Sequence, residues 1–270
     1  MLYVSEYGSS SNPTIVFLHG GGGGGWMWQP QVEALKAEYH LLVPDLPEHG
    51  HSAAIKPFTI ASSADHVAEL IRTRAHGGKA HVVGLSEGAQ ITVALLAKAP
   101  ELVDHAFISS ALVREMFGMS WFGAGVWAAM YRSIEPLNKY KWWMLLNMRS
   151  NGIPDRFLPE MAEAYKSLTA EAFGHIIAEN QRFRLPEGLE RVTSPTLVVG
   201  GRKEYKIMHQ SIKDVAAAIP GARGYLVSHT KKMSLSQEHN WSMTAPELFT
   251  CTVRAWIEDQ PLPEELKPLR

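Results

Sequence analysis

The segment with the clearest capacity for chemistry is Gly84-Leu-Ser-Glu-Gly88, a G-x-S-x-G pattern centred on Ser86. The β-branched pair Val82-Val83 precedes it and helix formers follow to about Lys98, so the pattern predicts a sharp turn between a strand and a helix. Such a turn holds a serine hydroxyl clear of the sheet, and side chains two residues before or after it would collide with neighbouring backbone. We predict that Ser86 is a nucleophile; the alternative is an ordinary serine that caps a helix.

A serine nucleophile needs a general base, and attack on a carbonyl needs donors for the negative oxygen that forms. The first amides of the helix point to the space above Ser86, so the amide of Glu87 is one expected donor. The run Gly20–Gly25 can bring backbone close to a substrate, and we expect the second donor at Gly21 or Gly22. The alternative is a phosphate-binding loop, but no Gly-Lys-Ser/Thr follows and the acidic residue of a dinucleotide site is missing.

Alternating strand and helix patterns surround these residues. Apolar runs predict strands at 2–7, 14–18, 40–45, 82–83, 103–108, 195–201 and 224–227. Helical patterns cover 31–38, 64–74, 87–98, 208–219 and 245–259. This alternation predicts an α/β fold with a mostly parallel, twisted sheet and helices on both faces. Residues 228–240 are expected to be a polar loop, and the proline-rich tail 261–270 to be frayed.

Residues 112–190 interrupt the alternation, because they lack a clear strand and are rich in aromatic residues and methionine. We predict one core domain from 1–111 and 191–270, with a helical cap inserted at 112–190. Tryptophans of the cap and of the glycine run are expected to line an apolar substrate pocket. These are Trp26, Trp121, Trp127, Trp142 and Trp143. Packing in the cap core is the alternative for most of them, and binding to a membrane surface is the alternative for Trp142-Trp143.

Composition excludes several other classes of protein. The net charge is −1 and no basic block stands out, which argues against a nucleic-acid partner. The single cysteine, Cys251, excludes an internal disulfide and fits a cytoplasmic location. No leader segment and no window of apolar residues long enough to span a membrane stands out, so no membrane insertion is expected. No histidine–carboxylate cluster has the spacing of metal ligands, so we expect neither a metal nor an organic cofactor.

Five motifs in order resemble the α/β-hydrolase fold family over nearly the whole chain. They are His19-Gly-Gly-Gly22, Asp45-Leu-Pro-Glu-His-Gly-His-Ser52, Gly84-Leu-Ser-Glu-Gly88, Gly201-Arg-Lys-Glu204, and His239 before Pro246-Glu-Leu-Phe249. The resemblance implies a catalytic triad in the chain order nucleophile, acid, histidine. It places these functions on Ser86, Glu204 and His239, with His229 as the rival histidine and a solvated surface carboxylate as the alternative for Glu204.

The chain departs from the family's pattern at a few positions around this site. The acid is more often Asp than Glu, and the residue before the catalytic histidine is usually Gly, whereas here it is Glu238. Glu48 also stands where the family usually has Gly. Glu87 at the start of a helix is favourable in itself, but a negative charge beside the nucleophile would oppose an oxyanion.

The resemblance implies a serine hydrolase that cleaves small to medium apolar carboxylic esters, or lactones, through an acyl-enzyme. The expected partner is therefore a small apolar ester. Because one fold hosts several chemistries, the alternatives are a hydroxynitrile lyase, a cofactor-free oxygenase, or a ligand receptor that keeps the triad with weak turnover.

Overall fold

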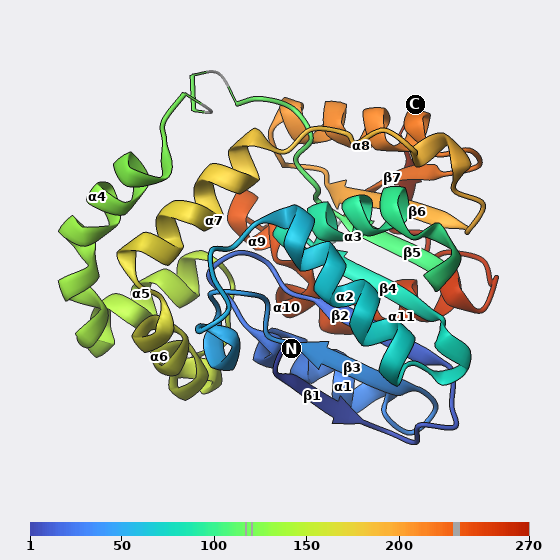
Figure 1. Ribbon diagram of the computed structural model, residues 1–270, viewed down its shortest axis with the longest axis horizontal. Coiled ribbons are helices and arrows are strands. Elements are labelled where there is room, and N and C mark those ends of the chain that lie inside the picture. The colour runs from blue at the N-terminus through green and yellow to red at the C-terminus, as the bar shows by residue number, and fades with distance from the viewer. Residues whose placement is uncertain (117, 120, 229–232, 270) are drawn as a thin grey trace.

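The computed structural model describes residues 1–116, 118–119, 121–228 and 233–269. Within these residues the chain forms an eight-stranded sheet in the order β1-β3-β2-β4-β5-β6-β7-β8 (Figure 1). The strands are β1 Val4–Tyr7, β2 Thr14–Leu18, β3 His40–Pro44, β4 Ala80–Leu85, β5 Val103–Ser109, β6 Thr196–Gly201, β7 Arg223–Val227 and β8 Leu266–Pro268. The strands from β3 to β7 in this order pair in parallel, and the edge strands β1 and β8 pair antiparallel.

Helices cover both faces of the sheet, which confirms the predicted fold class. The helices of the sheet domain are α1 Gln29–Leu35, α2 Ile60–Arg74, α3 Glu87–Lys98, α8 Lys206–Ala218, α9 Leu235–His239, α10 Trp241–Thr244 and α11 Pro246–Ile257. One buried cluster joins α2, α3 and α8 to one face, and a second joins α1 and α11 to the other. The central strands β2, β3, β4 and β6 are buried at every residue, as their continuous apolar runs predict.

Four helices lie between β5 and β6 and gather at one side of the sheet domain (Figure 1). They are α4 Ala124–Ile134, α5 Lys141–Ser150, α6 Leu158–Ser167 and α7 Ala170–Arg182, and the word cap is used below for these four α-helices and the turns between them. Helix α7 is bonded to the sheet domain: the Glu179 carboxylate accepts from the Ile60 amide at 3.0 Å, and Asn180 and Gln90 exchange two hydrogen bonds of 3.0 Å. Helix α4 packs against α7.

Two expectations for the C-terminal part are wrong. The tail was expected to be frayed. Instead β8 pairs with β7 at the edge of the sheet, and the apolar side chain of Leu266, which follows the prolines, is buried there. Residues 235–239 were expected to be loop, but they form α9. This helix begins with a capping box in which Ser234 and Gln237 satisfy each other's backbone amides.

Candidate active site

Ser86 lies between β4 and α3 in a strained backbone conformation, with φ 56° and ψ −111°. A Cβ added at Gly84 would lie 2.3 Å from the Gly88 carbonyl oxygen, and one at Gly88 would lie 2.2 Å from the Leu18 carbonyl oxygen. The two glycines therefore permit the close approach of strand and helix that this turn requires. The Ser86 amide donates to the Ser109 carbonyl at 2.8 Å, which fixes the turn against β5.

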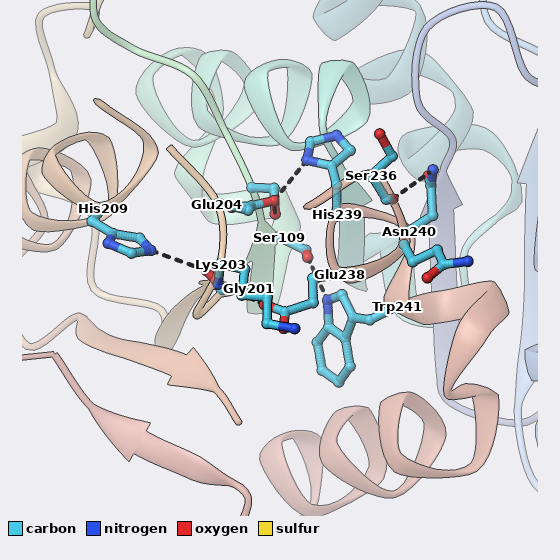
Figure 2. Close-up of polar contacts among 12 residues, drawn as sticks. Ser109, Gly201, Lys203, Glu204, His209, Ser236, Glu238, His239, Asn240 and Trp241 are labelled. Atoms are coloured by element: carbon cyan, nitrogen blue, oxygen red, sulfur yellow. Dashed lines mark hydrogen bonds and ion pairs between the residues drawn. The ribbon is translucent and has the colours of Figure 1, made fainter. Parts of the chain in front are cut away.

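A buried carboxylate and a histidine meet beside this turn. His239 Nδ1 lies 2.7 Å from Glu204 Oε1, and Figure 2 shows the two side chains facing each other from the loop after β6 and the end of α9. Burial lowers the pKa of His239, but the hydrogen bond and charge of Glu204 outweigh it, so the pKa is raised overall. With Nδ1 bonded to Glu204, the other ring nitrogen, Nε2, is the one available as a base.

The glycines at the end of β6 make room for a glutamate where the family more often has aspartate. A Cβ at Gly200 would lie 2.9 Å from Glu204 Oε2, and one at Gly201 would lie 3.3 Å from Glu204 Cγ. The longer side chain thus occupies the space beside these two residues. The Ser110 hydroxyl donates to Glu204 Oε1 at 2.8 Å, so the same oxygen is held by both Ser110 and His239.

Glu238, the residue in place of the family's usual glycine, connects helix α9, which ends with the base, to the loop after β6, which carries the acid. Its carboxylate is 3% exposed and accepts from the Lys203 amide at 2.6 Å. Because Lys203 precedes Glu204 and Glu238 precedes His239, this bond fixes the two side chains relative to each other. Two residues after His239, the Trp241 indole donates to the Ser109 hydroxyl at 2.9 Å (Figure 2).

The glycine run lies over the serine and is supported by two buried histidines. His49 Nε2 accepts from the Gly22 amide at 3.0 Å, while His49 Nδ1 donates to the Pro47 carbonyl at 2.9 Å. Burial and neighbouring His19 lower the pKa of His49 to about 3, so this ring is neutral and can accept. The Gly22 amide is therefore already engaged, and Gly21 is the remaining candidate donor of the pair.

Glu87 is buried directly beneath the glycine run. Its side chain is 1% exposed, and a Cβ added at Gly21 would lie 2.7 Å from its Oε2 atom. Neither carboxyl oxygen has a hydrogen-bond partner within the described residues, and His49 Nε2 is 3.9 Å from Oε1. Burial and the nearby charge of Glu179 raise the pKa of Glu87 well above its usual range. The raised pKa favours the neutral acid, and a neutral Glu87 would carry no negative charge to oppose an oxyanion.

Glu48 bridges the loop after β3 to the cap. Its backbone has φ 61°, a left-handed conformation that explains why glycine is usual here. Its buried carboxylate accepts from the Phe58 amide at 2.8 Å and lies 2.8 Å from His175 Nδ1 on α7. The substitution thus adds a contact between this loop and the cap.

Two cavities of about 350 Å³ and 270 Å³ meet at the serine, and Ser86, Asn151, His239 and Asn240 line both. The larger runs under the cap past the glycine run, and the smaller extends toward Ser110, Met208 and Tyr205. Both catalytic candidates thus face a common space in which a substrate carbonyl can lie.

Of the five tryptophans expected in the pocket, Trp26 and Trp143 line the larger cavity. Trp121, Trp127 and Trp142 line neither cavity, so the expectation is wrong for them. Trp121 and Trp142 are 87% and 59% exposed, and Trp127 is buried in the cap against Phe122. Trp142 and Trp143 are consecutive on α5, about 100° apart around the helix, so only one of them can face the cavity. The rival base His229 lies outside the described residues.

The site consists of a strained serine after a parallel strand and of a histidine–carboxylate pair that comes from later in the chain and lies at the same edge of the sheet. This is the arrangement of the α/β hydrolases. The sequence model of the family described as "Alpha/beta hydrolase family" matches residues 15–248. The chain therefore belongs to the α/β-hydrolase family.

Comparisons with individual proteins agree with this assignment. The chain is 30% identical to an AB hydrolase superfamily protein of Gibberella zeae over 94% of this chain and 84% of that protein. It is 26% identical to a pimeloyl-[acyl-carrier protein] methyl ester esterase of Neisseria meningitidis serogroup C, over 90% of this chain and 93% of that one. The crystal structure of an enol-lactonase from Burkholderia xenovorans superposes with a TM-score of 0.72 at 21% identity, covering 95% of this chain and 96% of that chain. Among the described residues, no helix is long and apolar enough to cross a bilayer.

Proposed function

We propose that this protein hydrolyses small to medium uncharged carboxylic esters or lactones through an acyl-enzyme on Ser86. The observation that carries the proposal is the 2.7 Å contact of Glu204 with His239 beside a strained serine that faces the same cavities. The names of the relatives, which include a methyl ester esterase and an enol-lactonase, support ester hydrolysis.

The proposed reaction follows from the bonds around the triad. His239 Nε2 takes the proton from Ser86 Oγ as that oxygen attacks the carbonyl carbon, and Glu204 stabilises the imidazolium that forms. The amides of Glu87 and Gly21 hold the negative oxygen of the tetrahedral intermediate. His239 then gives its proton to the departing alcohol, leaving Ser86 acylated. A water molecule, deprotonated by His239, repeats the attack and releases the acid.

The cavities define the substrate by charge and polarity. The larger one combines apolar side chains, including Met161 and Phe173, with the amides of Asn138, Asn147 and Asn151. Among the described residues lining either cavity there is no lysine or arginine. A substrate carboxylate would lose its hydration without gaining a cation, so we expect neutral acyl groups to be preferred over anionic ones.

The test is release of p-nitrophenol from acetyl, butyryl, octanoyl and dodecanoyl esters. The Ser86→Ala variant should lose about 10⁴-fold or more of the enzymatic rate, while Ser133→Ala, on the exposed face of α4, should keep it. A fluorophosphonate should also add its mass to the wild type and not to Ser86→Ala. Full turnover in Ser86→Ala would refute the proposal. Absence of turnover on every ester and lactone would instead favour lyase, oxygenase or receptor activity.

A further inference from the structure

A second group of side chains able to bind a metal lies at the edge of the sheet opposite the serine. His81 is near the start of β4, and Asp104 and His105 are near the start of β5. One potential ligand atom from each residue lies within 4.8 Å of those from the other two. Ser86 follows the other end of β4, about 17 Å away at 3.3 Å per residue, so this group is separate from the candidate active site.

A β-bulge brings the three side chains together. Ala80 pairs with Val103 but Val82 pairs with Ala106, so two residues of β5 oppose the single residue His81. Consecutive residues of a regular strand point to opposite faces of the sheet. At the bulge, in contrast, Asp104 Oδ1 lies 3.3 Å from His105 Nδ1, and the rings of His81 and His105 have centroids 5.2 Å apart.

The imidazole nitrogens of this group are buried without hydrogen-bond partners. Among the described residues, His81 Nδ1 and both ring nitrogens of His105 have no hydrogen-bond partner, although the two residues are only 7% and 9% exposed. Buried polar atoms are normally hydrogen-bonded, so these nitrogens lack the partners that buried imidazoles usually have. The Asp104 side chain is 55% exposed, which gives an ion access from solvent.

We propose that His81, Asp104 and His105 bind a divalent transition-metal ion of the Zn²⁺ type. Two imidazoles and one carboxylate suit Zn²⁺, Ni²⁺ or Cu²⁺ rather than Mg²⁺ or Ca²⁺, which prefer oxygen ligands. Metal–ligand distances of about 2.0–2.2 Å place the ligand atoms of a tetrahedral site about 3.3–3.5 Å apart. The contact between Asp104 and His105 already has this spacing, so closure requires His81 to approach by no more than about 1.5 Å, the difference between 4.8 Å and 3.3 Å.

Asp259, two residues after the end of α11, lies beside the site. Its carboxylate lies 3.8 Å from His105 Nε2, the nitrogen on the other side of the ring from Asp104. A carboxylate that accepts from the second nitrogen of a metal-binding histidine fixes the ring and makes it a better ligand, so movement of Asp259 into hydrogen-bond distance of Nε2 would strengthen the site. A bound ion would therefore join β4, β5 and the segment after α11, and stabilise the fold without taking part in the reaction at Ser86.

The test is titration of the untagged, EDTA-treated protein with ZnCl₂ against a chromophoric chelator, followed by thermal unfolding with and without Zn²⁺. The wild type should bind one ion per chain and unfold at a higher temperature when it is bound. His81→Gln and Asp104→Asn should each weaken binding at least about 10-fold. His51→Gln is the matched control, because it also removes a histidine beside an aspartate, Asp45, and should leave binding unchanged.

Three outcomes would overturn the proposal. They are no saturable binding by the wild type, equal affinity in Asp104→Asn and the wild type, and binding that is lost in His239→Gln but kept in Asp104→Asn. The last would place the ion at the candidate active site. If His81→Gln fails to fold, Asp104→Asn still decides the question, because it changes a half-exposed side chain at the start of a strand and its folding can be checked by thermal unfolding in EDTA.

Discussion

Replacing Glu87 by glutamine is expected to change how the stability of the protein depends on pH. The carboxyl group is buried beneath Gly21 without a hydrogen-bond partner among the described residues, and its pKa is raised well above the ordinary 4.5. In the unfolded chain the same group ionises near its ordinary pKa. Between the two pKa values the folded state therefore holds one proton more than the unfolded state, and the free energy of unfolding falls as pH rises.

The size of the effect follows from this single proton. Each pH unit between the two pKa values lowers the free energy of unfolding by about 1.4 kcal/mol through Glu87 alone, so the wild type should lose stability as pH rises from 5.5 toward neutrality. Glutamine does not titrate, and all other groups are shared. The stability of Glu87→Gln relative to wild type should therefore increase with pH, by up to about 1.4 kcal/mol per pH unit.

The assay is urea unfolding followed by tryptophan fluorescence at several pH values across this range. Glu69→Gln, at an exposed position of α2, is the matched control and should run parallel to the wild type. The quantity to compare is how the difference in free energy of unfolding between Glu87→Gln and the wild type changes with pH. Any cost of fitting an amide beneath Gly21 is the same at every pH and does not affect this change. A constant difference between Glu87→Gln and wild type would show that Glu87 is already ionised in the folded protein and would refute the reasoning.

Further expected outcomes concern the groups around the triad. Glu204→Gln should lower kcat/KM for an ester about 10³- to 10⁴-fold. The acid limb of its pH–rate profile should also move to lower pH, because the carboxylate that raises the pKa of His239 is gone, and an unshifted limb would contradict this. Glu238→Ala leaves the Lys203 amide without its acceptor, so it should lower the free energy of unfolding in urea by about 1–3 kcal/mol and should also lower kcat. Glu238→Gln keeps an acceptor oxygen and should retain most of the wild-type stability and kcat. Gly88→Ala would place a methyl group 2.2 Å from a carbonyl of β2 and should destabilise by about 1–3 kcal/mol or more; unchanged stability would mean that the turn can relax.

The strands and the serine turn could be predicted because their signals are local. Continuous apolar runs indicate strands buried on both faces, and the observed β2 and β6 agree closely with the predicted ranges. The glycines around Ser86 are required by steric contacts within a few residues, so the pattern itself contains the reason for the turn. The α/β fold could be predicted in the same way, because it follows from the order in which these local strand and helix signals alternate along the chain.

The supporting contacts could not be predicted because they join residues far apart in the chain. Ser110 and Glu204 are 94 positions apart, and nothing in the sequence around Ser110 indicates that its hydroxyl meets the acid. The proposed metal-binding cluster has the same origin, since the pairing of β4 with β5 brings the ring of His81 beside that of His105, 24 positions further along the chain. The direction of a side chain on a helix, as for Trp142, depends on which neighbours the helix meets.

The attachment of the cap has a consequence for redesigning specificity. Helix α7 is bonded to the sheet domain through Glu48–His175, Ile60–Glu179 and Gln90–Asn180. Most of the cap side chains that line the larger cavity instead come from α4, α5 and α6 and the turns between them. We therefore expect that exchanging the segment 124–167 for helices of another length would resize the cavity, provided that the new first helix keeps the packing of α4 on α7, while α7 holds the loops around the serine in place.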